Sequence, residues 1–116
     1  MSMSEKTVFQ RIIDREIPAE IVYEDEQCIA FKDIRPAAPV HILVVPKKAV
    51  PTLNDVTPSD EVLLGHLFIA MKTIADKLGL KGGFRVVCNC GPDAGQEVMH
   101  VHFHMLGGRT FGWPPG

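Results

Sequence analysis

The chain has 116 residues, of which 46% are hydrophobic and 22% are charged, with a formal net charge of -2. This length predicts a single domain over residues 1–116 with a modest core, and the composition excludes an intrinsically disordered chain. No apolar run is long enough to span a membrane, and the basic surplus typical of nucleic-acid-binding proteins is missing. Residues 1–6 lack the apolar stretch of a signal peptide, so we expect a flexible N-terminus and a cytoplasmic protein.

The three cysteines are an odd number in a chain that shows no secretion signal, which predicts reduced thiols. Cys88 and Cys90 are separated by one residue, whereas zinc knuckles and redox motifs use a gap of two. We interpret Cys28, Cys88 and Cys90 as buried or half-buried structural residues.

The first predicted helix begins at Thr7 and runs to about Arg15. Thr7 and Gln10 fit a capping box, and Pro18 is expected to stop the helix. Apolar residues follow the cap on one face of this helix: Phe9, Ile12 and Ile13.

Two short strands, 21–23 and 28–31, are joined by a charged turn and predict an antiparallel hairpin. The segment 33–39 contains two prolines and is expected to be stiff and extended, with Asp33 able to cap its turn. The apolar run 40–45 then predicts a strand covered on both faces and ended by Pro46. His41 is the one polar residue of this run, and both a structural and a functional role are open for it.

The long helix is predicted from Thr57, with Pro58 at its first helical position, through 61–78 to Gly79. His66 lies on this helix outside any cluster and is interpreted as a structural or surface residue. The apolar face is wider than one stripe, which indicates contact with the sheet and with a further partner such as a second subunit. The residues that widen it are Leu64, Phe68 and Met71.

A strand is predicted over 84–88, and a glycine-containing loop over 89–96 leads into the histidine-rich stretch 99–105. Such a loop exposes backbone amides and allows an anion to approach closely, although a plain hairpin connection is the alternative. The order of elements is helix, hairpin, strand, long helix and hairpin. It predicts an α+β domain with an antiparallel sheet.

Three histidines, His100, His102 and His104, occupy alternate positions of the last predicted strand. Side chains of a strand alternate between its faces, so all three imidazoles are expected on one face and the intervening apolar residues in the core. Such rings can bind a transition metal such as zinc, or they can act without metal, with one ring as nucleophile and the others as orienting groups and proton donors. The spacing leaves both possibilities open. No acidic ligand adjoins the strand at metal spacing, which counts against a metalloprotein built on these three residues.

The stretch His100 to Leu106 resembles the signature of the histidine triad (HIT) superfamily. Its flanking segments are similar to those of the Hint branch, the histidine triad nucleotide-binding proteins, and the resemblance extends from Phe9 to Gly116. The segments that carry it are Asp33-Ile34, 39–48, 89–96, 106–109 and Trp113-Pro114-Pro115-Gly116.

The resemblance implies a HIT-like α+β fold: an antiparallel five-stranded sheet with one short and one long helix, continuous across a homodimer. It places the segment 107–116 near the dimer interface and the opening of the site. It further implies a purine nucleoside phosphoramidase that hydrolyses the P–N bond of adenosine 5′-monophosphoramidates, including AMP-lysine, through a nucleotidyl-histidine intermediate. The implied partners are purine nucleotides, meaning AMP and GMP derivatives, with no cofactor, no metal, no nucleic acid and no membrane.

The resemblance also implies roles for single residues. His102 is the nucleophile, His104 contacts the phosphate and assists proton transfer, and His100 and His41 orient the nucleophile. The nucleotide contacts comprise Asp33 and Ile34 at the ribose, Asn89, Gly95, Gln96, Glu97 and Val98 at the phosphate side, and Phe9, Ile12, Ile17, Phe31 and Leu43 at the base.

Glu97 departs from the family pattern, because many Hint proteins have serine at this position. A carboxylate repels a phosphate unless it points away, is protonated or meets the leaving ammonium group. We hypothesise that Glu97 favours amine-bearing leaving groups or bridges to a partner subunit. The alternative functions are a dinucleoside polyphosphate hydrolase, a nucleotide-binding regulatory protein, and a metalloprotein that uses His100, His102 and His104.

Overall fold

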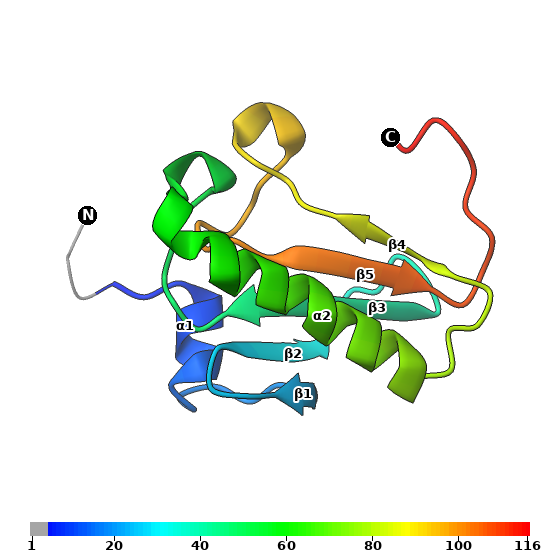
Figure 1. The fold of residues 1–116 in the computed structure, drawn as a ribbon, viewed down its shortest axis with the longest axis horizontal. Helices are drawn as coiled ribbons and strands as arrows, with labels where there is room; N and C mark the ends of the chain where they lie inside the picture. Colours follow the sequence, from blue (N-terminus) through cyan, green and yellow to red (C-terminus); the bar gives the residue numbers. More distant parts are fainter. Residues whose placement is uncertain (1–4) are drawn as a thin grey trace.

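The computed structural model describes residues 5–116, and its five strands form one antiparallel sheet in the order β1-β2-β3-β5-β4 (Figure 1). The fold is therefore α+β, as the order of elements predicted. None of the described helices is long and apolar enough to cross a membrane. The strands are β1 (Ile21–Glu24), β2 (Cys28–Lys32), β3 (Val40–Pro46), β4 (Phe84–Val87) and β5 (Phe103–Gly107).

The long helix α2 (Glu61–Lys77) crosses one face of the sheet (Figure 1). Its buried residues include Leu67, Met71 and Ile74, which are at most 1% exposed. Beneath them lie every second residue of β2 and β3, together with Phe103 and Met105 of β5. This is the larger of the two hydrophobic clusters.

The short helix α1 (Val8–Ile13) packs on the opposite face of the sheet. Phe9 and Ile12 meet the alternate residues of β2 and β3 there, and Phe9 contacts the ring of Phe31 with centroids 5.6 Å apart. The period of two along β2 and β3 thus divides their side chains between two cores. The smaller core consists of Phe9, Ile12, Ile29, Phe31, Leu43 and Val45.

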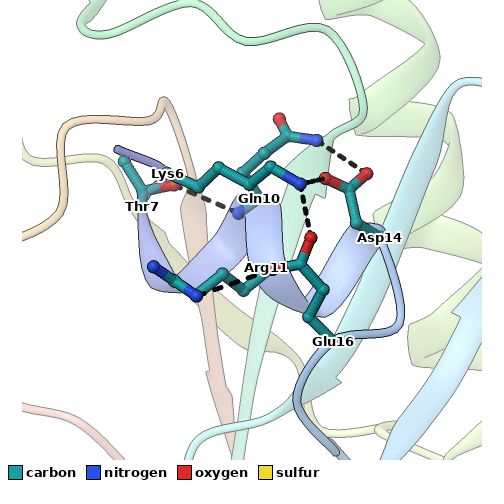
Figure 2. Close-up of polar contacts among 6 residues, drawn as sticks. All are labelled: Lys6, Thr7, Gln10, Arg11, Asp14 and Glu16. Atoms are coloured by element: carbon teal, nitrogen blue, oxygen red, sulfur yellow. Dashed lines mark hydrogen bonds and ion pairs between the residues drawn. The ribbon is translucent and has the colours of Figure 1, made fainter. Parts of the chain in front are cut away.

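Polar contacts hold α1 at both ends (Figure 2). The Gln10 backbone N–H donates to Thr7 Oγ1 at 3.1 Å, so Thr7 is the N-cap, but the predicted capping box is not completed because the Gln10 side chain bonds Asp14 instead of Thr7. Lys6 Nζ lies 2.7 Å from Asp14 Oδ2 and also pairs with Glu16, while the Gln10 side-chain amide donates to Asp14. Of the segment 1–6, which was expected to be flexible, residues 1–4 lie outside the described residues, whereas Lys6 is held by these ion pairs.

Three boundaries differ from the predicted ones. Helix α1 ends at Ile13, because Arg15 adopts a left-handed backbone (φ 63°) and the chain leaves helical geometry before Pro18. Helix α2 begins at Glu61, after a separate 3₁₀ turn over Pro58–Asp60. Strand β5 begins only at Phe103, so the preceding histidines lie on irregular backbone.

Candidate active site

A cavity of about 620 Å³ opens on the face of the sheet that carries α1. One wall is apolar and comes from α1, from the segment after it, and from β2 and β3. The other wall is polar and comes from 32–35, from the loop before β5, and from two histidines. The lining residues are Val8, Phe9, Ile12, Ile17, Pro18, Ala19, Phe31, Lys32, Asp33, Ile34, Arg35, Leu43, Asn89, Gly95, Glu97, Val98, His102 and His104.

The cavity brings together most of the residues that the sequence singled out. His41 and His100 are buried and do not line it, and neither does the half-buried Gln96. Five lining residues were missed. All of them lie within two positions of a predicted residue in the chain, which is the signal that would have found them: Val8, Pro18, Ala19, Lys32 and Arg35.

His102 is buried, at 6% exposure, and its ring is held from two sides. Its Nδ1 lies 2.8 Å from the backbone carbonyl oxygen of His100, and the ring of Phe9 meets it edge-on at a centroid distance of 4.8 Å. A carbonyl oxygen can only accept, so Nδ1 carries the proton and donates it. The lone pair of neutral His102 is therefore on Nε2.

His104 and His41 form a second fixed pair. The Ala37 backbone N–H donates to His41 Nδ1 at 3.0 Å, so the proton of neutral His41 is on Nε2. That Nε2–H donates to His104 Nδ1 at 2.8 Å. His104 consequently carries its own proton on Nε2 and can donate it within the cavity, next to His102, whose ring centroid is 5.2 Å away.

His100 is a supporting residue rather than a lining one. At 1% exposure it lies beneath the cavity, and its Nε2–H donates to the backbone carbonyl of Pro46 at 2.7 Å. This bond ties the irregular segment before β5 to the end of β3. The carbonyl oxygen that fixes His102 belongs to the same residue.

Gln96 fastens the loop before β5. Its side-chain oxygen accepts from the Gly91 N–H at 2.9 Å, and its amide donates to the carbonyls of Pro51 and Val98. All three contacts are to backbone, so Gln96 holds the loop that presents Asn89, Gly95 and Glu97 to the cavity.

Burial lowers the pKa of both His100 and His104. For His104, the neighbouring His102 and His41 add to the effect, while Asp33 and Glu97 oppose it. Both imidazoles are thus kept neutral at pH 7, which agrees with the proton positions assigned from their hydrogen bonds.

The free energy of unfolding is expected to fall as the pH is lowered from 7 to 5. Unfolded histidines bind protons near pH 6.5, whereas His100 and His104 in the folded chain bind them only at lower pH. The unfolded state therefore takes up more protons in this window, and each unit of pKa difference costs about 1.4 kcal/mol. Urea unfolding at a series of pH values measures the slope. The His104→Gln variant should lose part of it, and a stability that rises toward pH 5 would contradict the assignment.

Two groups of metal-ligating residues occur among residues 5–116: Asp33 with His41 and His104, and Asp25 with Cys28 and His66. The three triad histidines do not form such a group, since His100 is bonded to a carbonyl beneath the cavity. An acid does lie close to the histidines, contrary to the sequence-based expectation, because Asp33 Oδ2 is 3.5 Å from His41 Nε2. The segment before β3 carries Asp33 to this position, which sequence spacing along β5 could not reveal.

His66 is in a cluster, also contrary to expectation, although its role is structural. Its Nε2 lies 2.6 Å from Asp25 Oδ2, and Tyr23 donates to the same oxygen. Burial alone would raise the pKa of Asp25, but donors from Gln27, His66 and Tyr23 overcome it and lower that pKa far below its usual range. Asp25 thereby ties the turn between β1 and β2 to α2.

Cys28 of this group is fully buried, and all three cysteines are free thiols, as predicted.

Comparison with known proteins gives a consistent result. The HIT domain matches residues 14–111. An uncharacterized HIT-like protein of Synechocystis sp. is 56% identical over 114 residues, which are 98% of this chain and 100% of the relative. A HIT family hydrolase from Legionella pneumophila superposes with a TM-score of 0.93 at 47% identity, covering 96% of this chain and 100% of that one.

A more distant solved structure is the histidine triad nucleotide-binding protein of Candida albicans. Its TM-score is 0.80 at 30% identity, with 96% of this chain and 85% of that chain covered. The fold, the order of the histidines and these matches agree over nearly the whole length of the chain. The chain therefore belongs to the HIT domain family.

Proposed function

We propose that this protein is a purine nucleoside phosphoramidase of the Hint branch, which hydrolyses the P–N bond of adenosine 5′-monophosphoramidates. The observation that carries the proposal is the proton arrangement of two adjacent histidines in one cavity. His102 has an unprotonated Nε2, and His104 beside it has a protonated one. A nucleophile next to a proton donor is what displacement of an amine from phosphorus requires.

The reaction proceeds in two displacements. His102 Nε2 attacks the α-phosphorus while the P–N bond to the amine breaks, and the amine leaves with a proton supplied from the side of His104. Water then attacks the nucleotidyl-histidine and returns a proton to His104, the bond from phosphorus to His102 breaks, and AMP is released. The covalent intermediate divides one difficult displacement into two easier ones. His41 positions His104, and His100 positions His102 through its backbone carbonyl.

The two walls of the cavity suit a purine nucleotide. The apolar wall of Phe9, Ile12, Ile17, Phe31 and Leu43 matches a flat base, and Asp33 with Ile34 at the rim matches the ribose. The loop residues Asn89, Gly95, Glu97 and Val98 adjoin the histidines, where the phosphate would bind. The nucleotide-binding name of the Candida albicans protein supports this assignment.

The direct test is AMP release from an adenosine phosphoramidate by metal-stripped protein, together with mass spectrometry of the acid-quenched reaction. We expect release without added metal and a transient nucleotidyl adduct on the peptide that contains His102. Hydrolysis that requires zinc would instead favour a metal site at Asp33, His41 and His104. Faster hydrolysis of dinucleoside polyphosphates than of phosphoramidates would favour the other hydrolase function.

Glu97→Ser is expected to weaken the preference for phosphoramidates with a charged amine, such as AMP-lysine, by about three- to tenfold in kcat/KM. Glu97 lines the cavity and lies close enough to His104 to act on its pKa. A carboxylate at this place attracts an ammonium group, whereas an uncharged leaving group gains no such attraction. The measurement compares kcat/KM for AMP-lysine and for an uncharged-amine analogue in both proteins. An unchanged ratio would remove this role for Glu97.

We further propose that the protein is a homodimer joined through strand β4. Among residues 5–116 this strand pairs only with β5, so its other edge is open there, and Phe84 and Val86 on it are exposed. On α2, the exposed residues Val62, Phe68 and Ile69 form an apolar face, and Trp113 is 83% exposed. Open edges and apolar faces of this kind are usually covered.

Light scattering should give twice the chain mass, and Val86→Lys should shift the equilibrium between dimer and monomer toward the monomer. A wild-type monomer at high protein concentration would contradict the proposal.

A further inference from the structure

A second cavity, of about 530 Å³, lies between the turn that follows α2 and the segment that follows β5. Both segments lie at the end of the sheet remote from α1 (Figure 1). The cavity shares no lining residue with the candidate active site. It is lined by residues 79–85 and 108–111.

All charged side chains that line this cavity are positive. Lys81, Arg85 and Arg109 line it, and no aspartate or glutamate does. Of the twelve Lys and Arg residues, seven form an ion pair with a carboxylate among the described residues. Three of the remaining five converge here, in a chain with a net charge of -2. Unneutralised cations around one concave surface create a local field that attracts an anion.

The two guanidinium groups are held in place by the C-terminal segment. Arg85 donates to the carbonyl of Gly112 at 2.8 Å, and Arg109 donates to the carbonyl of Thr110 at 3.1 Å. Both lie over the ring of Phe111, at 5.2 and 4.1 Å from its centroid. Each guanidinium has five N–H donors, so these contacts fix its direction and leave donors free for a ligand. Such preorganised groups lose less entropy on binding.

The backbone of the turn is also accessible. Gly82 and Gly83 line the cavity, and a Cβ built on either would have no atom within 4 Å. Gly83 has a φ of 106°, a conformation that favours glycine. A ligand can therefore approach the main chain closely beside the ammonium group of Lys81.

We propose that this cavity is a second binding site, separate from the active site, for a compact polyanion with at least two phosphate groups. Two held guanidinium groups and the ammonium group of Lys81 line one cavity of about 530 Å³, which has room for more than one phosphate group. The recognition is electrostatic and directed at phosphate oxygens, with bidentate contacts from the arginines. The class of ligand is thus an inorganic or organic diphosphate, for which inorganic pyrophosphate is the simplest probe.

The test is a titration of the isotopically labelled protein with pyrophosphate at 0.15 M salt, followed by backbone amide NMR. We expect saturable shifts at Gly82, Gly83 and Arg109, and Lys81→Gln should weaken binding about five- to tenfold. Lys77→Gln is the matched control, because Lys77 is also without a carboxylate partner and lies outside the cavity. It should change the affinity less than twofold.

Two outcomes would overturn the proposal. Shifts confined to Asn89, Gly95 and the other active-site residues would place the probe in the first cavity. Equal weakening of pyrophosphate binding by Lys77→Gln and Lys81→Gln would mean that only the overall charge attracts pyrophosphate.

Because Lys81 is exposed on a turn, its substitution tests the site without disturbing the core. Arg109→Gln, checked for folding by circular dichroism, should weaken binding at least as much.

Discussion

Replacement of His102 by alanine is expected to lower the rate of AMP release by about a thousandfold or more. The substitution removes the group whose Nε2 attacks phosphorus, and no other described residue can replace it. His104 Nδ1 is occupied by His41, while His100 lies beneath the cavity with Nε2 bonded to Pro46. The remaining residues would still bind the nucleotide, so the loss should appear in kcat rather than in KM.

Single-turnover measurements on purified protein test this expectation, with mass spectrometry to detect the nucleotidyl adduct. His66→Ala is the matched control: it also removes an imidazole, but from the face of the sheet that α2 covers, where it binds Asp25. The control should keep its rate at temperatures well below its melting point. A His102→Ala protein that still forms an adduct, or that retains a tenth of the rate, would show that another residue is the nucleophile.

Leu67→Ala is expected to destabilise the fold by about 2–5 kcal/mol. Leu67 is completely buried, at the centre of the contact between α2 and the sheet. Removing its side chain leaves a cavity whose walls, among them Met71 and Ile74, are held by the helix and cannot collapse fully. A loss of this size is a large fraction of the stability of a domain of this length.

Urea unfolding measures the change, with Leu78→Ala as the control for the same chemical substitution. Leu78 caps the end of α2 and is 37% exposed, so its replacement should cost less than half as much. Equal losses for the two variants would mean that burial against the sheet is not what stabilises α2. If the protein is a dimer, both variants must be compared at the same protein concentration.

The alternation of side chains was the most informative feature of the sequence. It correctly placed Phe103 and Met105 in the core under α2, and His102 and His104 on the face with the cavity. Met99, by contrast, is 52% exposed, and His100 does not line the cavity. The placement of His102 holds even though β5 starts only at Phe103. Phe9 and Ile12 likewise reached the cavity, since the apolar face of α1 packs on the sheet.

Features that depend on tertiary contacts could not be predicted. The approach of Asp33 to His41 follows from the path of the segment before β3, and no spacing encodes it. The proton of His104 is assigned through His41 by a backbone N–H of another segment, and that of His102 by the local fold of the backbone, which turns the His100 carbonyl toward its ring. Gln96 was expected at the phosphate side because of its place in the loop, yet its three contacts are all to backbone.

The smaller hydrophobic core beneath α1 is open on one side, where it forms the apolar wall of the active-site cavity. Of its six buried residues, Phe9, Ile12, Phe31 and Leu43 also line the active-site cavity. A flat apolar ring that enters this cavity therefore occupies the position of a missing core side chain and removes the same surface from water. The bound molecule then acts as a seventh member of that core. The same side chains therefore contribute to the free energy of unfolding and to ligand affinity. A substitution among them that lowers one of these quantities will also lower the other.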